Sequence, residues 1–391
     1  MKNYYTRILS INNISDITDD LSIEIPQQYI SINSTPIKIN NLDSFEIQVL
    51  YDIYSANNAD VFLSINQRDI IINASLSHHK SAIILLSNRC PELSKSIDDA
   101  IKKYYQTPIL DVPHSKKLLN LAENMKERTI IMGILNVTPD SFSDGGQYID
   151  ADIAVKKAIK MAEDGADIID IGGESTRPGS DFISTDEEIS RVVPVIKALQ
   201  NKLDIPISID TWKSKVANEA INYGAEIIND ISAGRFDSKI LDVAAQSKLP
   251  YIIMHTKSQP KTMQNNPTYE NLIDEVYQFL YDRLLVCQSV GINNKSIIID
   301  PGFGFGKTVK HNLLLLKRLT EFKSLGRPIL MGVSKKSTIG KVLGDLPIEE
   351  RQEGTAGAVA VSILNGTNIV RVHDVLEMKR VSIMVDAVLN I

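Results

Sequence analysis

The sequence predicts an α/β protein in which a (β/α)8 barrel, or TIM barrel, follows a smaller N-terminal α/β domain. Its 391 residues exceed the length of most single domains, so one large and one small domain are expected. From residue 129 onward, a glycine that ends a helical segment is followed three residues later by a strand rich in Ile and Val. This spacing occurs at Gly165, Gly224, Gly326 and Gly366, and it is typical of the return from helix to strand in a βα unit.

The predicted small domain spans residues 1–125, where short apolar runs alternate with polar segments rich in Asn and Ser. We find no catalytic pattern in it, and the sequence assigns it no role. His78 and His79 are adjacent, so their side chains diverge in any regular element, and a solvated pair on the surface is predicted. A helical segment at 118–126 leads into the predicted barrel domain, residues 126–391.

Eight strands are predicted in this second domain. They lie at about 130–137, 167–172, 206–210, 227–231, 251–255, 296–300, 328–333 and 369–373. Eight parallel strands that alternate with helices over about 260 residues match the count and length of a barrel. An open, doubly wound sheet is the alternative. The residues at the strand ends favour the barrel, because a barrel gathers all of them at one mouth.

The first predicted strand leads into the most polar loop of the chain. Residues 130–135 are apolar, rich in β-branched side chains and without helical periodicity, which is typical of a strand buried on both faces. Polar side chains then follow within nine positions: Asn136, Thr138, Asp140, Ser141, Ser143 and Asp144. Ligands of parallel α/β proteins bind at the carboxyl ends of the strands, so this loop is a candidate part of a site.

Polar residues stand at or just beyond the other seven predicted strands as well. They are Glu174-Ser175-Thr176-Arg177, Asp210, Asn229, Met254-His255, Asp300, Ser334-Lys335-Lys336-Ser337, and Arg371 with His373. A single Asp or Asn in such a place is usually a helix cap, and we interpret Asp230 and Asp374 in that way. Polar residues after all eight strands indicate a binding site.

The strand-end residues divide by charge. The cationic ones are Lys336, Arg371 and His373, all from the last two strands, where barrel enzymes often bind phosphate. Arg371 and His373 alternate around Val372 and therefore project to one side of their strand, which suits a polyphosphate. The acidic and amide group comprises Asp210, Asn229 and Asp300. Buried carboxylates need donors, so this group favours a flat, nitrogen-rich heterocycle, and both a purine and a pterin fit.

A glycine-rich segment, residues 302–308, ends like a phosphate-binding P-loop. Pro301 stands where that motif requires its first glycine, so we reject a P-loop. The glycines instead indicate a backbone that approaches a flat ligand closely, with Phe303 or Phe305 as a stacking face. Lys307 is interpreted as a solvated side chain.

Composition limits the partners and the compartment. The net charge of −6 argues against nucleic acid or an anionic membrane as a main partner. Cys90 and Cys287 belong to no metal-ligand spacing, which favours a reducing compartment. We find no signal-peptide pattern and no apolar run of about 18 residues. A cytoplasmic protein is expected.

Residues 129–391 resemble a dihydropteroate synthase. The stretches that carry the resemblance are Asn136 to Gly146, Gly172-Gly173-Glu174-Ser175-Thr176-Arg177-Pro178-Gly179, Ile209-Asp210-Thr211, Ile228-Asn229-Asp230, Asp300 to Lys307, Ser334-Lys335-Lys336-Ser337 and Arg371-Val372-His373-Asp374. The first two are long and specific to the synthases. The resemblance implies a barrel that condenses 6-hydroxymethyl-7,8-dihydropterin diphosphate with p-aminobenzoate, giving 7,8-dihydropteroate and pyrophosphate.

The resemblance also implies roles for particular residues. Asp210, Asn229, Met254, Asp300 and Lys336 match pterin contacts, Arg371 and His373 match diphosphate contacts, and Asn136 matches the ligand of a Mg²⁺ cofactor on the diphosphate. Phe142, Thr176, Arg177, Pro178, Phe305, Lys336 and Ser337 match the surroundings of p-aminobenzoate. Asp140, Arg177, Asp210 and Lys336 are expected to be catalytic. Members of the family commonly pair through outer helices, so a homodimer is expected.

An aromatic amine is a weak nucleophile, so an S_N1-like path is expected, in which cations take up charge on the departing pyrophosphate. Three alternatives remain at this point: a pterin-dependent methyltransferase domain, a non-catalytic pterin-binding protein, and a synthase that uses a substituted aminobenzoate. Lys335 replaces a common Arg, and Thr256-Lys257-Ser258 departs from the usual continuation after Met-His. Both departures bear on substrate preference.

Overall fold

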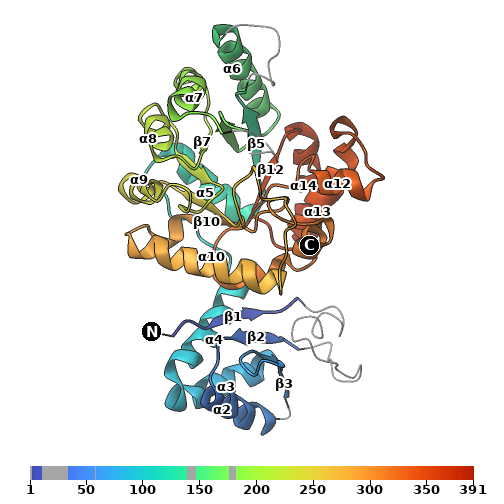
Figure 1. Ribbon diagram of the computed structural model, residues 1–391. Helices are drawn as coiled ribbons and strands as arrows, with labels where there is room; N and C mark the ends of the chain where they lie inside the picture. The colour runs from blue at the N-terminus through green and yellow to red at the C-terminus, as the bar shows by residue number, and fades with distance from the viewer. Residues whose placement is uncertain (1, 11–33, 58, 139–146, 176–181) are drawn as a thin grey trace. The chain divides into compact units, whose positions relative to one another are not determined.

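A computed structural model describes residues 2–10, 34–57, 59–138, 147–175 and 182–391 (Figure 1). By internal contacts the chain divides into two compact units, Met1–Pro108 with Arg318–Gly326 and Ile109–Lys317 with Arg327–Ile391. The domain limits 1–125 and 126–391 stay a prediction.

The second unit is built on eight parallel strands. They are β5 (Ile130–Asn136), β6 (Ile168–Gly172), β7 (Ile207–Asp210), β8 (Ile227–Asp230), β9 (Tyr251–Met254), β10 (Ile297–Asp300), β11 (Leu330–Met331) and β12 (Ile369–Val372). They pair in the order β10-β9-β8-β7-β6-β5-β12-β11, and a parallel bridge between Ile299 and Ile329 links the two ends of the sheet. The sheet is therefore a nearly closed barrel, which confirms the predicted barrel and each of its eight strands.

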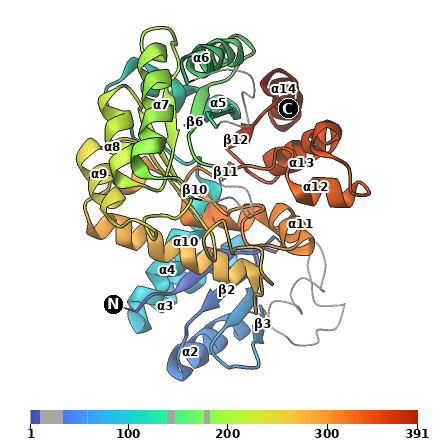
Figure 2. The same cartoon turned by 45° about the horizontal axis from the view of Figure 1, so that its top comes forward.

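Helices lie around the outside of this barrel and at its amino-terminal end. They are α5 (Lys116–Glu127), α6 (Gln147–Glu163), α7 (Thr185–Leu199), α8 (Ser214–Asn222), α9 (Lys239–Ser247), α10 (Leu272–Ser289), α11 (Val309–Lys317), α12 (Ser337–Val342), α13 (Gln352–Leu364) and α14 (Val375–Leu389), with short 3-10 turns η3 (Asn294–Ser296) and η5 (Ile348–Glu350). Figure 2 shows α7, α8 and α9 side by side outside the strands. No helix in the described part of the chain has the length and apolar character to cross a bilayer.

Helix α5 closes the amino-terminal end of the barrel. Its apolar residues Leu118, Leu121 and Met125 pack in one cluster with residues at the starts of the strands. Those strand residues include Ile130, Ile168, Ile227, Ile252, Ile298, Leu330 and Ile369. Because the amino-terminal end is filled with apolar side chains, the polar residues at the carboxyl ends of the strands face the opposite mouth.

The first unit has an antiparallel sheet in the order β1-β2-β4-β3. Its elements are β1 (Tyr5–Ile8), β2 (Ile37–Asn40), α2 (Ser44–Ser55), β3 (Asp60–Leu63), β4 (Ile70–Asn73), α3 (Leu76–Arg89), α4 (Pro91–Tyr105) and the 3-10 helix η4 (Leu319–Leu325). Ile37, Ile39, Ile70 and Ile72 lie at the centre of its apolar core. The helix η4, which belongs to this unit, comes from a part of the chain between α11 and β11.

A fully buried ion cluster ties η4 to β1 within the first unit. Arg7 Nε donates to Glu321 Oε2 at 2.8 Å, and neither side chain has any exposed surface. Arg318 donates from Nε to Oε1 at 2.6 Å and from Nη2 to Oε2 at 2.9 Å. The Ser10 N–H donates to Oε1 as well, at 3.1 Å. Both oxygens of the buried carboxylate are thereby paired, as a buried charge requires.

The prediction of a solvated histidine pair is wrong for His79. His78 is exposed, but His79 has no exposed surface, because α3 turns it into the core. Its Nε2 lies 2.7 Å from the Thr35 carbonyl oxygen, so Nε2 carries the proton, and Nδ1 then accepts from the Tyr54 hydroxyl at 2.9 Å. Burial lowers the pKa of His79 to about 4, opposed by the bond to Thr35, so the ring is neutral at pH 7.

Candidate active site

The carboxyl ends of the strands place predicted site residues side by side. Asp210 at the end of β7 is the register partner of Asn229 in β8, and Asp300 at the end of β10 is the partner of Met254 in β9. Asn136, the last residue of β5, pairs with Gly172 of β6. Parallel register puts these residues at one level of the barrel, so they gather at one mouth, as the pattern of strand ends indicated.

An ion-pair network crosses this mouth. Arg371 donates from Nε to Asp170 Oδ2 and from Nη2 to Asp210 Oδ2, both at 2.6 Å. The Asn229 amide nitrogen donates to Asp170 Oδ2 at 3.1 Å. One arginine from β12 thus joins carboxylates from β6 and β7, and a neighbouring strand adds an amide.

Asp170 is a site residue that the sequence analysis missed. It lies inside β6, in the run Ile168-Ile169-Asp170-Ile171, with no exposed surface. Candidate residues were selected at or just beyond the ends of the predicted strands, and Asp170 lies before the end of its strand. The available signal was physical: a carboxylate in the middle of a buried apolar strand needs a specific partner, and Arg371 is that partner.

The two carboxylates each keep one oxygen without a hydrogen-bond partner in the described part of the chain. These atoms are Oδ1 of Asp170 and Oδ1 of Asp210, and both are buried. Burial raises the pKa of Asp210, while the positive charge of Arg371 opposes that rise. Buried polar atoms in folded proteins are normally satisfied, so these two oxygens are candidate acceptors for the N–H donors of a ligand.

Lys336 lies on the other side of the mouth, against the glycine-rich segment. Its Nζ donates to the Phe303 carbonyl and lies 4.6 Å from the centre of the Phe305 ring. Burial lowers the pKa of Lys336 to about 8, and the nearby carboxylate of Asp300 opposes the effect. Phe303 itself is buried, whereas Phe305 is partly exposed, so Phe305 is the ring available for stacking. Ser337 follows at the start of α12 and is exposed.

The comparisons with known proteins agree with this geometry. The sequence pattern of the family described as pterin binding enzymes matches residues 132–373. The dihydropteroate synthase of Bacillus subtilis (strain 168) is 48% identical over 269 residues, covering 69% of this chain and 92% of that protein. The dihydropteroate synthase of Haemophilus influenzae is 50% identical over 245 residues, covering 63% and 88%. The chain belongs to the dihydropteroate synthase family.

Solved dihydropteroate synthases share the fold of the second unit. The synthase of Xanthomonas albilineans with 4-aminobenzoic acid superposes with a TM-score of 0.64 at 39% identity, over 68% of this chain and 94% of that one. The same organism's synthase in complex with 7,8-dihydropteroate gives 0.62 at 37% identity, over 68% and 95%. As a member of the dihydropteroate synthase family, the chain is a transferase enzyme.

Five residues that the resemblance to the synthases implicates lie outside the described residues. They are Asp140, Phe142, Thr176, Arg177 and Pro178. Glu174, just before the second of these stretches, accepts from the Ile183 N–H at 2.9 Å and from Trp212 Nε1 at 3.0 Å. Lys213 donates to the Ile183 carbonyl at 2.8 Å and to the fully buried Glu188 at 2.7 Å. Buried charges therefore fix the chain on both sides of residues 176–181.

Lys307, in the family's glycine-rich segment, is not solvated as predicted. Only 3% of it is exposed, and Nζ lies 2.9 Å from His255 Nδ1, 2.9 Å from the Gly302 carbonyl and 3.1 Å from the Phe305 carbonyl. Burial lowers its pKa to about 7, opposed by Asp300. The prediction failed because the segment folds back over its own lysine.

Asp230 and Asp374, the two aspartates that were predicted to cap helices, have different partners. Asp230 accepts from the Ser232 and Gly234 N–H groups and from the Tyr251 hydroxyl, so it has a structural role but holds a turn and caps no helix, which corrects the predicted cap. Asp374 precedes α14, but its side chain caps no helical N–H, which corrects the predicted cap. It forms an ion pair with Lys335 at 2.8 Å instead. In the second family departure, Lys257 binds the Thr268 carbonyl and Glu275.

Proposed function

We propose that this chain is a dihydropteroate synthase in folate biosynthesis, condensing 6-hydroxymethyl-7,8-dihydropterin diphosphate with p-aminobenzoate to release pyrophosphate. One observation carries the proposal: Asp170 and Asp210, beside the Asn229 amide, each keep one buried oxygen that has no hydrogen-bond partner among the described residues. A pterin ring presents adjacent N–H donors and a flat face, so it supplies the missing hydrogen bonds. Asp300, Met254 and Lys336 complete the proposed pterin pocket from the neighbouring strands.

The diphosphate is proposed to bind at the end of β12. Arg371 already uses Nε and Nη2 for Asp170 and Asp210, so we assign the diphosphate to its remaining Nη1 and to His373. The Ser334 hydroxyl lies 2.9 Å from His373 Nδ1 and orients the ring. Positive charge at this position would stabilise the negative charge that a leaving group develops, which is how enzymes most effectively lower such barriers.

The residues present fit a Mg²⁺ ion on the diphosphate. No group of three or more His, Cys, Asp or Glu side chains suited to a metal occurs among the described residues. Mg²⁺ needs no such group, since it usually takes one or two protein oxygens together with phosphate oxygens and water. The Asn136 amide oxygen, on the half-buried end of β5, is the proposed protein ligand. When bound, the ion would neutralise charge on the diphosphate.

We propose an S_N1-like path in which C–O cleavage precedes amine attack. Arg371 and Lys336 stabilise the departing pyrophosphate, and the Asp210 carboxylate stabilises the cation conjugated with the dihydropterin ring. p-Aminobenzoate then enters against Phe305, Lys336 and Ser337, with Phe142, Thr176, Arg177 and Pro178 proposed to complete its subsite and Asp140 to assist catalysis. No side chain acts as a covalent nucleophile. A strict requirement for the amine before any C–O cleavage in a single turnover would contradict this path.

We propose a cytoplasmic homodimer that pairs through α13 and α14. These two helices pack against each other and expose a set of apolar side chains: Val361, Leu364, Ile383, Met384 and Val388. Exposed apolar side chains on two helices that pack together favour an interface. Sedimentation equilibrium tests it, with Met384→Lys and Ile383→Lys expected to give monomers.

The decisive experiment measures pyrophosphate release from the dihydropterin diphosphate with Mg²⁺, with and without p-aminobenzoate, and identifies the product by mass. Release coupled to 7,8-dihydropteroate supports the proposal. Tight pterin binding with product only from a substituted aminobenzoate would assign a different amine. Pterin binding without any coupled product refutes the proposal and leaves the methyltransferase and the binding-protein alternatives.

A further inference from the structure

The segment Gly302–Gly306, called the glycine loop below, is closely packed on two sides. Gly302, Gly304 and Gly306 have φ values of +75°, +83° and +59°, a region that side chains other than glycine disfavour. A Cβ at Gly302 would lie 1.9 Å from the His255 carbonyl oxygen, and one at Gly304 would lie 2.7 Å from Lys336 Cδ. The loop therefore fits between β9 and Lys336 only with glycine at these positions.

Every carbonyl of the glycine loop accepts a hydrogen bond from a side chain. The donors are Lys307 to Gly302 (2.9 Å) and to Phe305 (3.1 Å), Lys336 to Phe303, Gln264 to Gly304 (2.8 Å) and Tyr269 to Gly306 (2.8 Å). A backbone with three left-handed residues makes no regular ladder, so these side chains fix its shape. Their number indicates a loop held in a single conformation.

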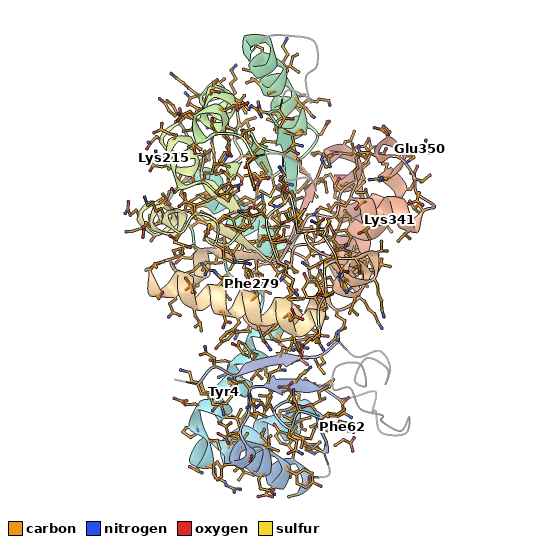
Figure 3. The ribbon with its side chains drawn as sticks, viewed as in Figure 1. Tyr4, Phe62, Lys215, Phe279, Lys341 and Glu350 are labelled. Atoms are coloured by element: carbon orange, nitrogen blue, oxygen red, sulfur yellow. The ribbon has the colours of Figure 1, made fainter. Side chains whose placement is uncertain are left out.

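Lys307 lies at the centre of this network. An ammonium group has three donors, and three acceptors surround Nζ: the carbonyls of Gly302 and Phe305 and His255 Nδ1. His255 is 4% exposed, and its ring meets the Phe279 ring edge-on at 4.9 Å. Figure 3 labels Phe279 on α10. The imidazole is therefore held as a fixed acceptor for Lys307.

The glycine loop in turn positions the proposed amine subsite. The Phe305 ring lies 4.6 Å from Lys336 Nζ, and the Phe303 carbonyl accepts from the same ammonium. We propose that Lys307 is a positioning residue: by holding the Gly302 and Phe305 carbonyls, it fixes the Phe305 ring and the Lys336 ammonium in the geometry that receives the acceptor amine. This inference rests on the proposed function and adds a residue to it.

The proposal separates amine binding from pterin binding. The open oxygens proposed to hold the pterin belong to Asp170 and Asp210 on β6 and β7, which are organised by Arg371 rather than by the glycine loop. Loss of Lys307 should therefore weaken amine binding more than pterin binding, although the pterin side shares Lys336 and Asp300 with the glycine loop, because Asp300 accepts from the Gly302 N–H at 2.7 Å. A role limited to general stability would change both together.

The test compares Lys307→Met, which keeps the aliphatic stem and removes the ammonium, with Lys310→Met, a matched change at an exposed lysine of α11. Steady-state kinetics give KM and kcat for p-aminobenzoate, and calorimetry gives the Kd of the pterin diphosphate. We expect kcat/KM for the amine to fall about 10²-fold in Lys307→Met, since small misplacements of binding groups cost that much. The pterin Kd should change less than about threefold, and Lys310→Met should match the wild type.

Two single-donor variants keep the proposal testable if Lys307→Met does not fold. Tyr269→Phe and Gln264→Leu each remove one donor from the glycine loop and should each lower kcat/KM for the amine about three- to tenfold. Unchanged amine kinetics in the folded variants, or equal losses in amine and pterin binding, would overturn the proposal.

Failure of the proposed function gives a different result. If the wild type forms no dihydropteroate, calorimetry of p-aminobenzoate with the protein loaded with pterin and pyrophosphate replaces the kinetics. A weaker amine affinity in Lys307→Met still supports the positioning role. Equal affinities, or no amine binding by the wild type, would refute it.

Discussion

The two units of the chain bury charge in opposite ways. In the first unit, Glu321 accepts from Arg7 and Arg318, and both of its carboxylate oxygens are paired. In the barrel, Arg371 pairs with Asp170 and Asp210, but each aspartate keeps one buried oxygen without a partner among the described residues. The closed pairing at Glu321 indicates structure, whereas the open oxygens of Asp170 and Asp210, which share one arginine at the barrel mouth, favour a ligand, because an unsatisfied buried oxygen is costly unless something fills it.

The largest expected effect, on the free energy of unfolding, comes from removing Glu321 from the closed ion cluster of the first unit. Glu321→Ala leaves two arginines buried without their carboxylate, so the free energy of unfolding should fall by about 3–5 kcal/mol. Urea unfolding measures it, with Glu123→Ala, at an exposed ion pair of α5, as the control that should cost less than about 1 kcal/mol. Below its melting temperature the variant should keep the wild-type kcat. A large loss of kcat in the folded variant would contradict a purely structural cluster.

Breaking the ion pairs of Arg371 with Asp170 and Asp210 should instead lower turnover. Arg371→Ala removes the partner of two carboxylates and a proposed diphosphate contact, so dihydropteroate formation should fall about 10²–10³-fold. Coupled pyrophosphate release measures the loss, and Arg380→Ala, at an exposed position of α14, is the matched control. Near-native turnover in Arg371→Ala would show that the network is structural after all.

A third comparison uses pH, through the neutral buried His79 of the first unit. Its pKa is lowered to about 4 in the folded protein, below the usual 6.5, so acid favours the unfolded state. The contribution of His79 to the free energy of unfolding is complete above about pH 6.5. It should fall by about 2–3 kcal/mol as the pH is lowered to 4. The pH dependence of urea unfolding measures it. His79→Gln should flatten the profile, while His78→Gln, at the exposed neighbour, should leave it unchanged.

The smallest expected effect concerns Lys336 in the barrel. Because its pKa is lowered to about 8, the side chain loses its charge as the pH rises above 8, and kcat/KM should fall on that alkaline limb. Lys336→Arg keeps the charge and should move the limb upward by at least about one pH unit, although a guanidinium does not reproduce the ammonium geometry. An unchanged alkaline limb in this variant would assign it to another group.

The sequence predicted the barrel well, since parallel strands buried on both faces leave a strong apolar signal and their ends leave a polar one. Asp210 and Asp300 were selected as candidates because each ends such a strand, and Asn229 stands one residue before the end of its strand. Asp170 was missed because its partner Arg371 lies far away in the sequence, and local pattern carries no information about such pairing. The burial of Lys307 was missed because the segment folds back over it, so that the Gly302 and Phe305 carbonyls and the distant His255 surround its ammonium.

His79 was missed for a related reason, because the side of α3 that faces the core depends on tertiary packing. The 3-10 helix η4 shows the same limit at the level of the fold. Nothing in residues 318–326 indicates that they belong with β1 and α4 rather than with the barrel strands on either side of them.

That placement of η4 sets an order for folding during synthesis. Arg7 and Glu321 are separated by 314 residues, so the first unit cannot complete its buried ion cluster until most of the barrel has been translated. At about 5–20 residues per second, the wait is roughly 15 to 60 s. The amino-terminal sheet is made first but its ion cluster is completed late, and during that interval the surfaces of β1 and α4 that η4 covers are exposed to chaperones, proteases and other nascent chains.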